Sequence, residues 1–248
     1  MTLGNAIGGL KGQVALVTGA SSGIGRAIAL MLSSDGADVC LVGRRETELR
    51  AVAEEAERHG SRAYVCCADL TCDENLQTLA QHVESRFRRL DILVLCGGAL
   101  VQGCLERASV ADFDLQYRSN VRGHYLLTQL MLPLLRGARG QIVFINSSAG
   151  LRSHAGAGQF SATQHALRAV ADSLRDEVNA DGIRVLGVYP GRTATPRMAA
   201  LFEKEGRPYR PELLMQPEDV ASMVIDVLRL PRTAEVTDIS MRSMEKSY

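Results

Sequence analysis

Short apolar segments alternate with longer amphipathic segments along the chain. Most of the short segments are apolar at consecutive positions, which is typical of parallel strands buried on both faces. Repeated strand–helix units with right-handed crossovers form a doubly wound parallel sheet. We therefore predict an α/β fold with a parallel seven-stranded sheet flanked by helices, its strands lying at residues 13–18, 38–42, 62–66, 92–96, 141–145, 183–188 and 236–240.

The segments between the predicted strands carry apolar residues every three or four positions, as amphipathic helices do. One such helix is expected to begin near Asp73, and its apolar face consists of Leu76, Leu79, Ala80, Val83 and Phe87. Two longer helices are expected at about residues 110–135 and 158–180. Their apolar stripes exceed what one face of a sheet has to bury, and two-fold pairing is the common way to cover the rest. We therefore expect a homodimer or a homotetramer.

No internal repeat or low-complexity linker divides the chain, so we expect one domain over residues 1–248. Residues 193–217 interrupt the alternation, because they hold four prolines and are too long for an ordinary strand–helix connection. Ligands of open α/β sheets bind at the carboxyl ends of the strands, and this segment follows such an end. We interpret it as a substrate lid; the alternative is a surface excursion without a ligand role.

Composition excludes several classes of function. Lys plus Arg and Asp plus Glu both number 28, so the formal net charge is zero, and no basic run indicates nucleic-acid binding. No apolar stretch approaches the ~20 residues of a membrane span, and the N-terminus lacks the pattern of a signal peptide. The six cysteines lack metal-ligand spacing and are interpreted as free thiols packed like small apolar residues. We therefore expect a cytoplasmic protein without a metal site.

A glycine-rich loop follows the first predicted strand and opens a helix, so its backbone can approach a pyrophosphate at the helix N-terminus. At the end of the second strand, Arg44 and Arg45 stand where an NAD enzyme would carry an acidic residue. Because arginine binds phosphate with a planar fork, we predict NADP(H) over NAD(H). The alternative is that both arginines only begin a solvated helix. The loop residues expected at the dinucleotide are Thr18, Gly19, Ser21, Ser22, Gly23, Ile24 and Gly25.

These motifs resemble those of the short-chain dehydrogenase/reductase family, and the resemblance covers nearly everything from Leu10 to Tyr248. The stretch at residues 145–150 is similar to the family's ISSxAG sequence, which implies that Ser147 is the catalytic serine. Asn120 matches the helix asparagine of the catalytic tetrad. The resemblance implies a Rossmann-type fold with further cofactor contacts at Asp69, Leu70, Gly97, Gly98, Pro190, Gly191, Thr193 and Thr195.

The chain departs from the family at the YxxxK pair, which is expected thirteen residues after Ser147. Phe160 stands at the Tyr position and Gln164 at the Lys position. Phe160 cannot transfer a proton, and losing a general acid costs about 10²–10⁴-fold in rate. Gln164 carries no charge, but it can still donate to the ribose hydroxyls of a cofactor. A second departure places Cys96 where the family has an asparagine; we interpret it as a core filler, the alternative being a reactive thiol.

Three hypotheses about function follow. The first is an NADP(H)-binding protein repurposed to atypical or non-redox chemistry on a small molecule. The second is a non-catalytic pseudoenzyme that binds or regulates an active partner, with a cofactor that binds weakly or not at all. The third is a weak NADPH-dependent ketone reductase that takes its proton from water or from His154, seven residues after Ser147. Histidine is the residue type best suited to act as acid or base near neutral pH; the alternative is that His154 is a polar loop residue.

Overall fold

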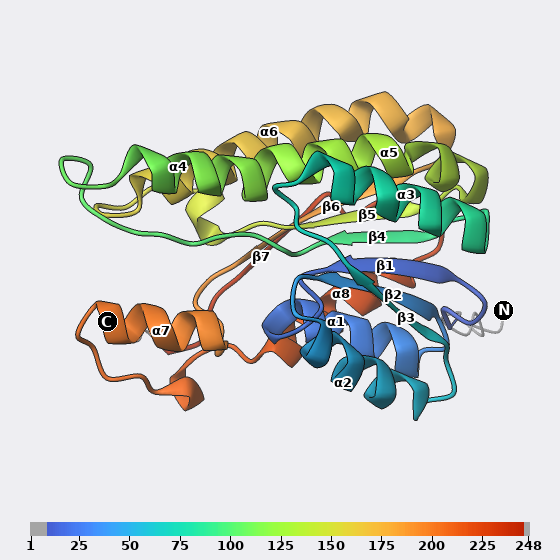
Figure 1. Cartoon of the computed structure of the whole chain (residues 1–248), viewed down its shortest axis with the longest axis horizontal. Coiled ribbons are helices and arrows are strands. Elements are labelled where there is room, and N and C mark those ends of the chain that lie inside the picture. The colour runs from blue at the N-terminus through green and yellow to red at the C-terminus, as the bar shows by residue number, and fades with distance from the viewer. Residues whose placement is uncertain (1–8, 246–248) are drawn as a thin grey trace, which may run out of the picture.

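The structure is a computed structural model that describes residues 9–245 (Figure 1). The expected domain and the interpretation of the N-terminus extend to residues 1–8 and 246–248, which lie outside the described residues. No helix within residues 9–245 is both long and apolar enough to cross a membrane.

Seven parallel strands form one sheet in the order β3-β2-β1-β4-β5-β6-β7. The predicted fold is therefore confirmed, and each predicted strand lies within two residues of its observed bounds. Every residue of β1, β4 and β5 is buried, because helices cover both faces of the sheet. The strands are β1 (Val14–Thr18), β2 (Asp38–Gly43), β3 (Ala63–Cys67), β4 (Ile92–Leu95), β5 (Gln141–Ile145), β6 (Arg184–Pro190) and β7 (Asp238–Met241).

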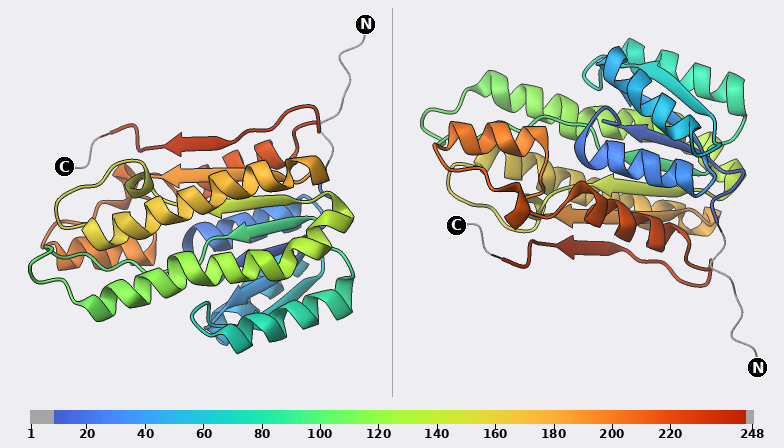
Figure 2. Two further views of the ribbon diagram at one scale, coloured as in Figure 1. Left: turned by 90° about the horizontal axis from the view of Figure 1, so that it is seen from above. Right: turned by 90° about the horizontal axis from the view of Figure 1, so that it is seen from below.

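Two layers of helices enclose the sheet (Figures 1 and 2). One face is covered by α1 (Gly23–Ser34), α2 (Glu46–Glu57) and α8 (Pro217–Leu228). The other face is covered by α3 (Asp73–Phe87), α5 (Gly123–Ala138) and α6 (Gly158–Val178). Successive strand side chains enter opposite cores, as the pleat of a strand requires: Ala15 packs in the first core and Leu16 in the second.

The long helix predicted at residues 110–135 is present, but it is not α-helical throughout. It consists of α4 (Val110–Tyr117), a π-helical turn η1 (Arg118–Arg122) and α5. The turn is held by Asn120, whose Oδ1 accepts the N–H of Ala99 at 2.7 Å and whose Nδ2 donates to the carbonyl of Ala99 at 2.9 Å. These two bonds join Asn120 to the segment that follows the carboxyl end of β4.

The segment predicted as a lid folds outside the sheet, at the lower left of Figure 1. It contains α7 (Pro196–Lys204) and a short 3₁₀ turn η4 (Pro211–Leu213). Thr195 caps α7 by accepting the N–H of Met198 at 3.2 Å, and Pro196 occupies the first turn, where its missing N–H leaves no bond unmade. Three of the four prolines, Pro196, Pro211 and Pro217, therefore begin helices, and the segment is not one long loop.

Candidate functional site

A cleft of about 1120 Å³ lies at the carboxyl ends of the strands. It is lined by the glycine loop after β1 and the segments after β2 to β6, with α7 on one side. All the candidate catalytic and cofactor-binding residues that the sequence analysis selects stand in its wall. The topology brings them together, because parallel strands end at the same edge of the sheet.

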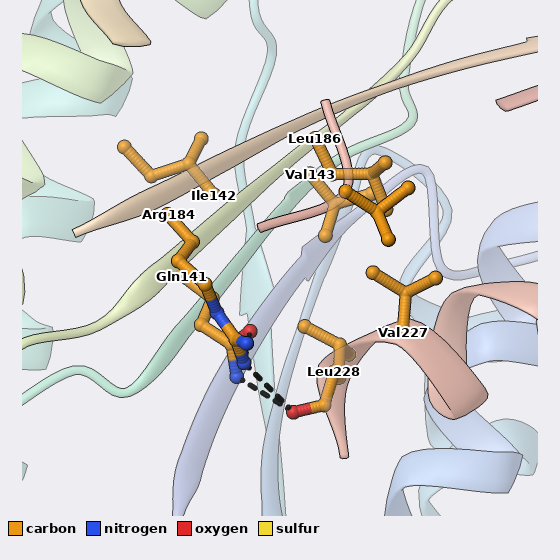
Figure 3. Close-up of a pocket in the computed structure, with 8 residues that line it drawn as sticks. Gln141, Ile142, Val143, Arg184, Leu186, Val227 and Leu228 are labelled. Carbon is orange, nitrogen blue, oxygen red and sulfur yellow. Dashed lines mark hydrogen bonds between the residues drawn. The ribbon is translucent and has the colours of Figure 1, made fainter. Parts of the chain in front are cut away.

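A second cavity, beneath α8, has a volume of only about 10 Å³ (Figure 3). Figure 3 shows Gln141 and Arg184 turned toward the end of α8, where both donate to the carbonyl of Leu228, at 3.0 and 3.2 Å. A space of this size holds about one water molecule. These polar groups join α8 to the sheet rather than form a ligand site.

The glycine loop is shaped by two positive backbone angles and by close contacts. Gly19 has φ +66° and Gly23 has φ +56°, a region that favours glycine. A Cβ on Gly19 would lie 3.0 Å from the backbone of Gly97, and one on Gly23 would lie 2.9 Å from Thr195. Side chains at these positions would therefore push apart the walls of the cleft.

Thr18, at the end of β1, holds the wall formed by the residues after β4. Its hydroxyl accepts the N–H groups of Cys96 and Gly97, at 2.9 and 3.0 Å. The same oxygen is 3.4 Å from the carbonyl of Val94, to which it donates. Thr18 therefore positions the backbone beside the glycine loop, a role that the loop motif alone does not indicate.

Arg45 joins the start of α2 to the glycine loop. Its Nη2 donates to Ser21 Oγ at 2.8 Å and to Ser22 Oγ at 2.9 Å. The guanidinium and the two hydroxyls thus converge at one point of the cleft. Hydroxyls and a charged fork in this arrangement match the oxygens of a phosphate group.

Arg44 extends the same end of the cleft toward β3. Its Nη1 lies 3.6 Å from Asp69 Oδ2, and the other oxygen of Asp69 accepts the N–H and the hydroxyl of Thr71, at 2.9 and 2.8 Å. Burial alone would raise the pKa of Asp69, but the bonds from Thr71 and the charge of Arg44 outweigh it and lower this pKa. Asp69 is therefore an anion at neutral pH, available as an acceptor.

The residues at the catalytic positions of the motif lie just after β5, in η1 and on α6. Ser147 follows β5, and its hydroxyl accepts the N–H of Ala149 at 3.1 Å. Phe160 and Gln164 lie four residues apart on α6, so they occupy one face of that helix, and both line the cleft. The Nδ2 of Asn120 donates to Thr163 on α6 at 3.1 Å. Among the described residues, neither a tyrosine nor a lysine lines this cleft.

Two histidines border this region. His154 lies in an exposed loop after β5 and lines the cleft, as expected. His124, which the sequence analysis did not select, is buried one turn beyond Asn120, and its Nδ1 lies 3.0 Å from the carbonyl oxygen of Asn120. Its Nε2 has no hydrogen-bond partner among the described residues. Burial lowers the pKa of His124 to about 4, so its ring is neutral and cannot act as an imidazolium acid at neutral pH.

Cys96 behaves as a packed thiol. Burial raises its pKa to about 12, and the nearby positive charge of Arg197 opposes this shift only in part. A thiol is reactive only as the thiolate, so this site does not favour the reactive alternative. The expectation of packed cysteines is wrong for Cys67 and Cys104, which are exposed. Cys67 is exposed because it ends β3, the edge strand of the sheet.

Several arginines of the cleft were not selected from the sequence. No local motif indicates them, because they come from separate segments after β5, β6 and β7 and meet only in the fold. They are Arg152, Arg192, Arg197 and Arg242.

Comparison with known proteins agrees with this arrangement. The sequence model described as short chain dehydrogenase matches residues 13–206. An uncharacterised oxidoreductase of Staphylococcus epidermidis is 31% identical over 234 residues, which cover 94% of this chain and 98% of that protein. A glycine betaine reductase of Emericella nidulans is 33% identical over 238 residues, covering 94% of this chain. This chain spans only 19% of the length of that reductase.

A solved structure with the same fold carries a nucleotide. It is a short chain dehydrogenase of Shigella flexneri in complex with NADP, 30% identical, and it superimposes with a TM-score of 0.87 over 95% of this chain and 99% of that one. The family match extends over most of this chain, and the Staphylococcus epidermidis relative matches over almost its whole length. The chain therefore belongs to the short-chain dehydrogenase/reductase family.

Proposed function

We propose that this protein binds NADP(H) in the cleft and acts on a small molecule by chemistry other than tyrosine-assisted carbonyl reduction. The observation that carries the proposal is the pair Phe160 and Gln164 in the wall beside Ser147, in a cleft whose described lining contains no tyrosine or lysine. The proposal keeps the family's cofactor and changes its proton chemistry.

The proposed binding of NADP(H) is supported by residues at the end of the cleft next to β2. Arg45, Ser21 and Ser22 converge where a 2′-phosphate would find a charged fork and two hydroxyls. The N-terminus of α1 follows directly after the glycine loop and suits a pyrophosphate. The related Shigella flexneri structure contains NADP. In this family the bound nicotinamide supplies or accepts a hydride.

The proposed change in proton chemistry follows from the side chains around Ser147. Adding a hydride to a carbonyl carbon places charge on its oxygen, which then needs a proton. Ser147 can donate a hydrogen bond to such an oxygen, and Gln164 can donate to a hydroxyl, but neither has a pKa suited to proton transfer at neutral pH. Reactions in which the substrate supplies its own proton, or rearrangements without redox, avoid this requirement.

A weak conventional reductase is the second candidate. The position of His154 supports this candidate function, because its exposed side chain lines the same cleft as Ser147. If His154 supplies the proton, a His154→Ala variant loses the activity; if water supplies it, the variant keeps the activity.

We also propose that two copies of the chain pair through α4 and α5. Large apolar side chains stay exposed along these helices: Val110 is 73% exposed, Tyr117 50% and Tyr125 49%. A second copy of the same surface would cover them in a two-fold contact. The segment at residues 193–217 is proposed as the lid of the cleft, since α7 contributes to its wall.

The test of the proposed function has two steps. NADPH is first titrated into the protein while its fluorescence is followed, and we expect saturable binding. The complex is then mixed with a panel of ketones and aldehydes in single-turnover experiments, where we expect no oxidation of NADPH above the rate without protein. Absence of NADPH binding would favour the pseudoenzyme, and rapid oxidation that depends on His154 would favour the weak reductase.

A further inference from the structure

The cleft is positively charged although the chain as a whole is neutral. Six arginines line it against two carboxylates. Both carboxylates already have arginine partners: Asp69 lies beside Arg44 at 3.6 Å, and Glu205 lies beside Arg192 at 3.2 Å. The cleft therefore holds cationic side chains that the protein itself does not neutralise.

The arginines without a carboxylate come from segments that follow strands in the half of the sheet opposite Arg44 and Arg45. Among the described residues, none of the three has a carboxylate oxygen within 4.0 Å. They follow β5, β6 and β7, whereas Arg44 and Arg45 follow β2, which is four strands from β6. At about 4.8 Å per strand, these two origins are roughly 19 Å apart. The three are Arg152, Arg197 and Arg242.

Arg197 has the clearest position of the three. It is the second residue of α7, and its Nη2 reaches across the cleft to donate to the carbonyl of Gly98 at 2.6 Å. Gly98 O is the one acceptor that the described residues offer to this guanidinium, which has five N–H donors. Desolvation by surrounding protein atoms lowers the pKa of Arg197.

Lys204 makes a second contact of the same kind. It lies seven residues after Arg197, two helical turns along the same face of α7, and its Nζ donates to the carbonyl of Gln102 at 3.2 Å. Two cations of α7 thus bind neutral carbonyls of the segment after β4. An anionic group would be a stronger partner for a guanidinium than a carbonyl oxygen, because both members of the bond are then charged.

We propose that Arg197 binds a carboxylate or phosphate group of the substrate, so that the substrate is an anionic carbonyl or hydroxy compound. This inference rests on the proposed function, because it assigns the substrate class of the same cleft. The phosphates of the cofactor have their own candidates at Arg45 and the glycine loop. The Gly98 carbonyl holds Arg197 in place, and the anionic group of the substrate takes up the fork of N–H donors that the carbonyl leaves free.

The test uses two ligands that share a keto group and differ in charge, benzoylformate and its methyl ester, with inorganic phosphate as a smaller anion. Binding of each is measured by calorimetry, with and without NADPH, to the wild-type protein and to Arg197→Gln and Arg197→Lys. The matched control is Arg210→Gln, because Arg210 is exposed on the same segment and does not line the cleft. Circular dichroism verifies that each variant is folded.

We expect the wild-type protein to prefer benzoylformate over the ester by about tenfold or more, as for a hydrogen bond between charged groups. Arg197→Gln should abolish this preference, Arg197→Lys should keep part of it, and Arg210→Gln should keep all of it. The proposal is overturned if the wild-type protein binds neither anion, or if Arg197→Gln still discriminates. It is also overturned if Arg197→Gln weakens only NADPH, since Arg197 would then serve a cofactor phosphate. Failure of NADPH to bind the wild-type protein contradicts the proposed function instead, and the titrations without NADPH still decide the role of Arg197.

Discussion

The guanidinium of Arg45 donates to the hydroxyl of Ser22 at 2.9 Å, and this bond links the first residues of α2 to the loop that opens α1. Two residues that are 23 positions apart in sequence therefore present one polar surface to the cleft. The preference for the phosphorylated cofactor should depend on this contact.

Replacing Arg45 by alanine should weaken NADPH binding about tenfold or more and leave NADH binding nearly unchanged, because only NADPH carries the 2′-phosphate. A hydrogen bond to a charged group contributes about 1.5–3 kcal/mol. Calorimetry with both cofactors measures the effect. Arg50→Ala is the matched control, because Arg50 pairs with Glu46 on the exposed side of α2. An equal loss for both cofactors would show that Arg45 only stabilises the loop.

The double variant Phe160→Tyr with Gln164→Lys should gain NADPH-dependent carbonyl reduction of roughly 100-fold or more over the parent protein. Either single change should give little, because tyrosine alone keeps a pKa near ~10 and lysine alone has no phenol to activate. Residues of one proton relay are strongly non-additive. Rates of NADPH oxidation for the four proteins measure this coupling.

Adding Ser147→Ala to the double variant should remove most of the gain, since Ser147 is placed to bind the substrate oxygen. A parent protein as fast as the double variant would mean that the chemistry does not need the missing pair. A silent double variant would favour the pseudoenzyme.

Cys96 should resist iodoacetamide near pH ~8, while Cys67 and Cys104 react within the same time. The pKa of Cys96 is raised to about 12, so its thiol stays protonated until the solution is strongly alkaline, and its labelling rate should rise with pH over that range. Peptide mass spectrometry identifies each labelled cysteine. Early labelling of Cys96 in the folded protein would contradict a packed thiol.

The protein should scatter light as a particle of at least twice the mass of one chain, and Tyr125→Glu should reduce it to the monomer. A charge at the centre of an apolar contact has no partner and must be desolvated. Met223→Glu is the control, because Met223 is equally apolar and 39% exposed but lies on α8, on the other side of the sheet. A wild-type monomer at micromolar concentration would overturn the proposed pairing.

Thr18→Val should lower the free energy of unfolding by about 1–3 kcal/mol, because the N–H groups of Cys96 and Gly97 lose their shared acceptor. Thr18→Ser keeps the hydroxyl and should be closer to the wild-type protein. Urea denaturation followed by circular dichroism compares the three proteins. Equal stability of the valine and serine variants would mean that water satisfies the two N–H groups.

The strands could be predicted because burial on both faces leaves a direct trace in the sequence, as in the run Ile92–Leu95. The glycine loop could be predicted because φ values such as that of Gly19 favour glycine. The π turn could not be predicted from the sequence. The spacing of apolar residues indicates which face of a helix is buried, but it does not indicate to which carbonyl each backbone N–H donates. In this turn the N–H of Gly123 bonds to the carbonyl of Arg118, five residues earlier, and the side chain of Asn120 bonds to Ala99 in a distant loop.

The candidate site was predictable where a motif gathers it in sequence, as around Ser147. Arg197 was not, because its position depends on how α7 lies over the cleft and on a carbonyl 99 residues away. His124 was also missed, since a histidine in the middle of a helix gives no sign of whether its ring is buried. The local sign that His124 lies near the candidate site was Asn120, one helical turn earlier.

Because of the π turn, the direction in which Asn120 points depends on how many residues the turn contains. Each residue of an α-helix rotates the chain by about 100°. Deleting one residue within Arg118–Arg122 would let the regular hydrogen-bond register run through, and α4 would turn by that angle relative to α5. Single-codon deletions within this turn should therefore misdirect Asn120, whereas many substitutions at its exposed positions should be harmless.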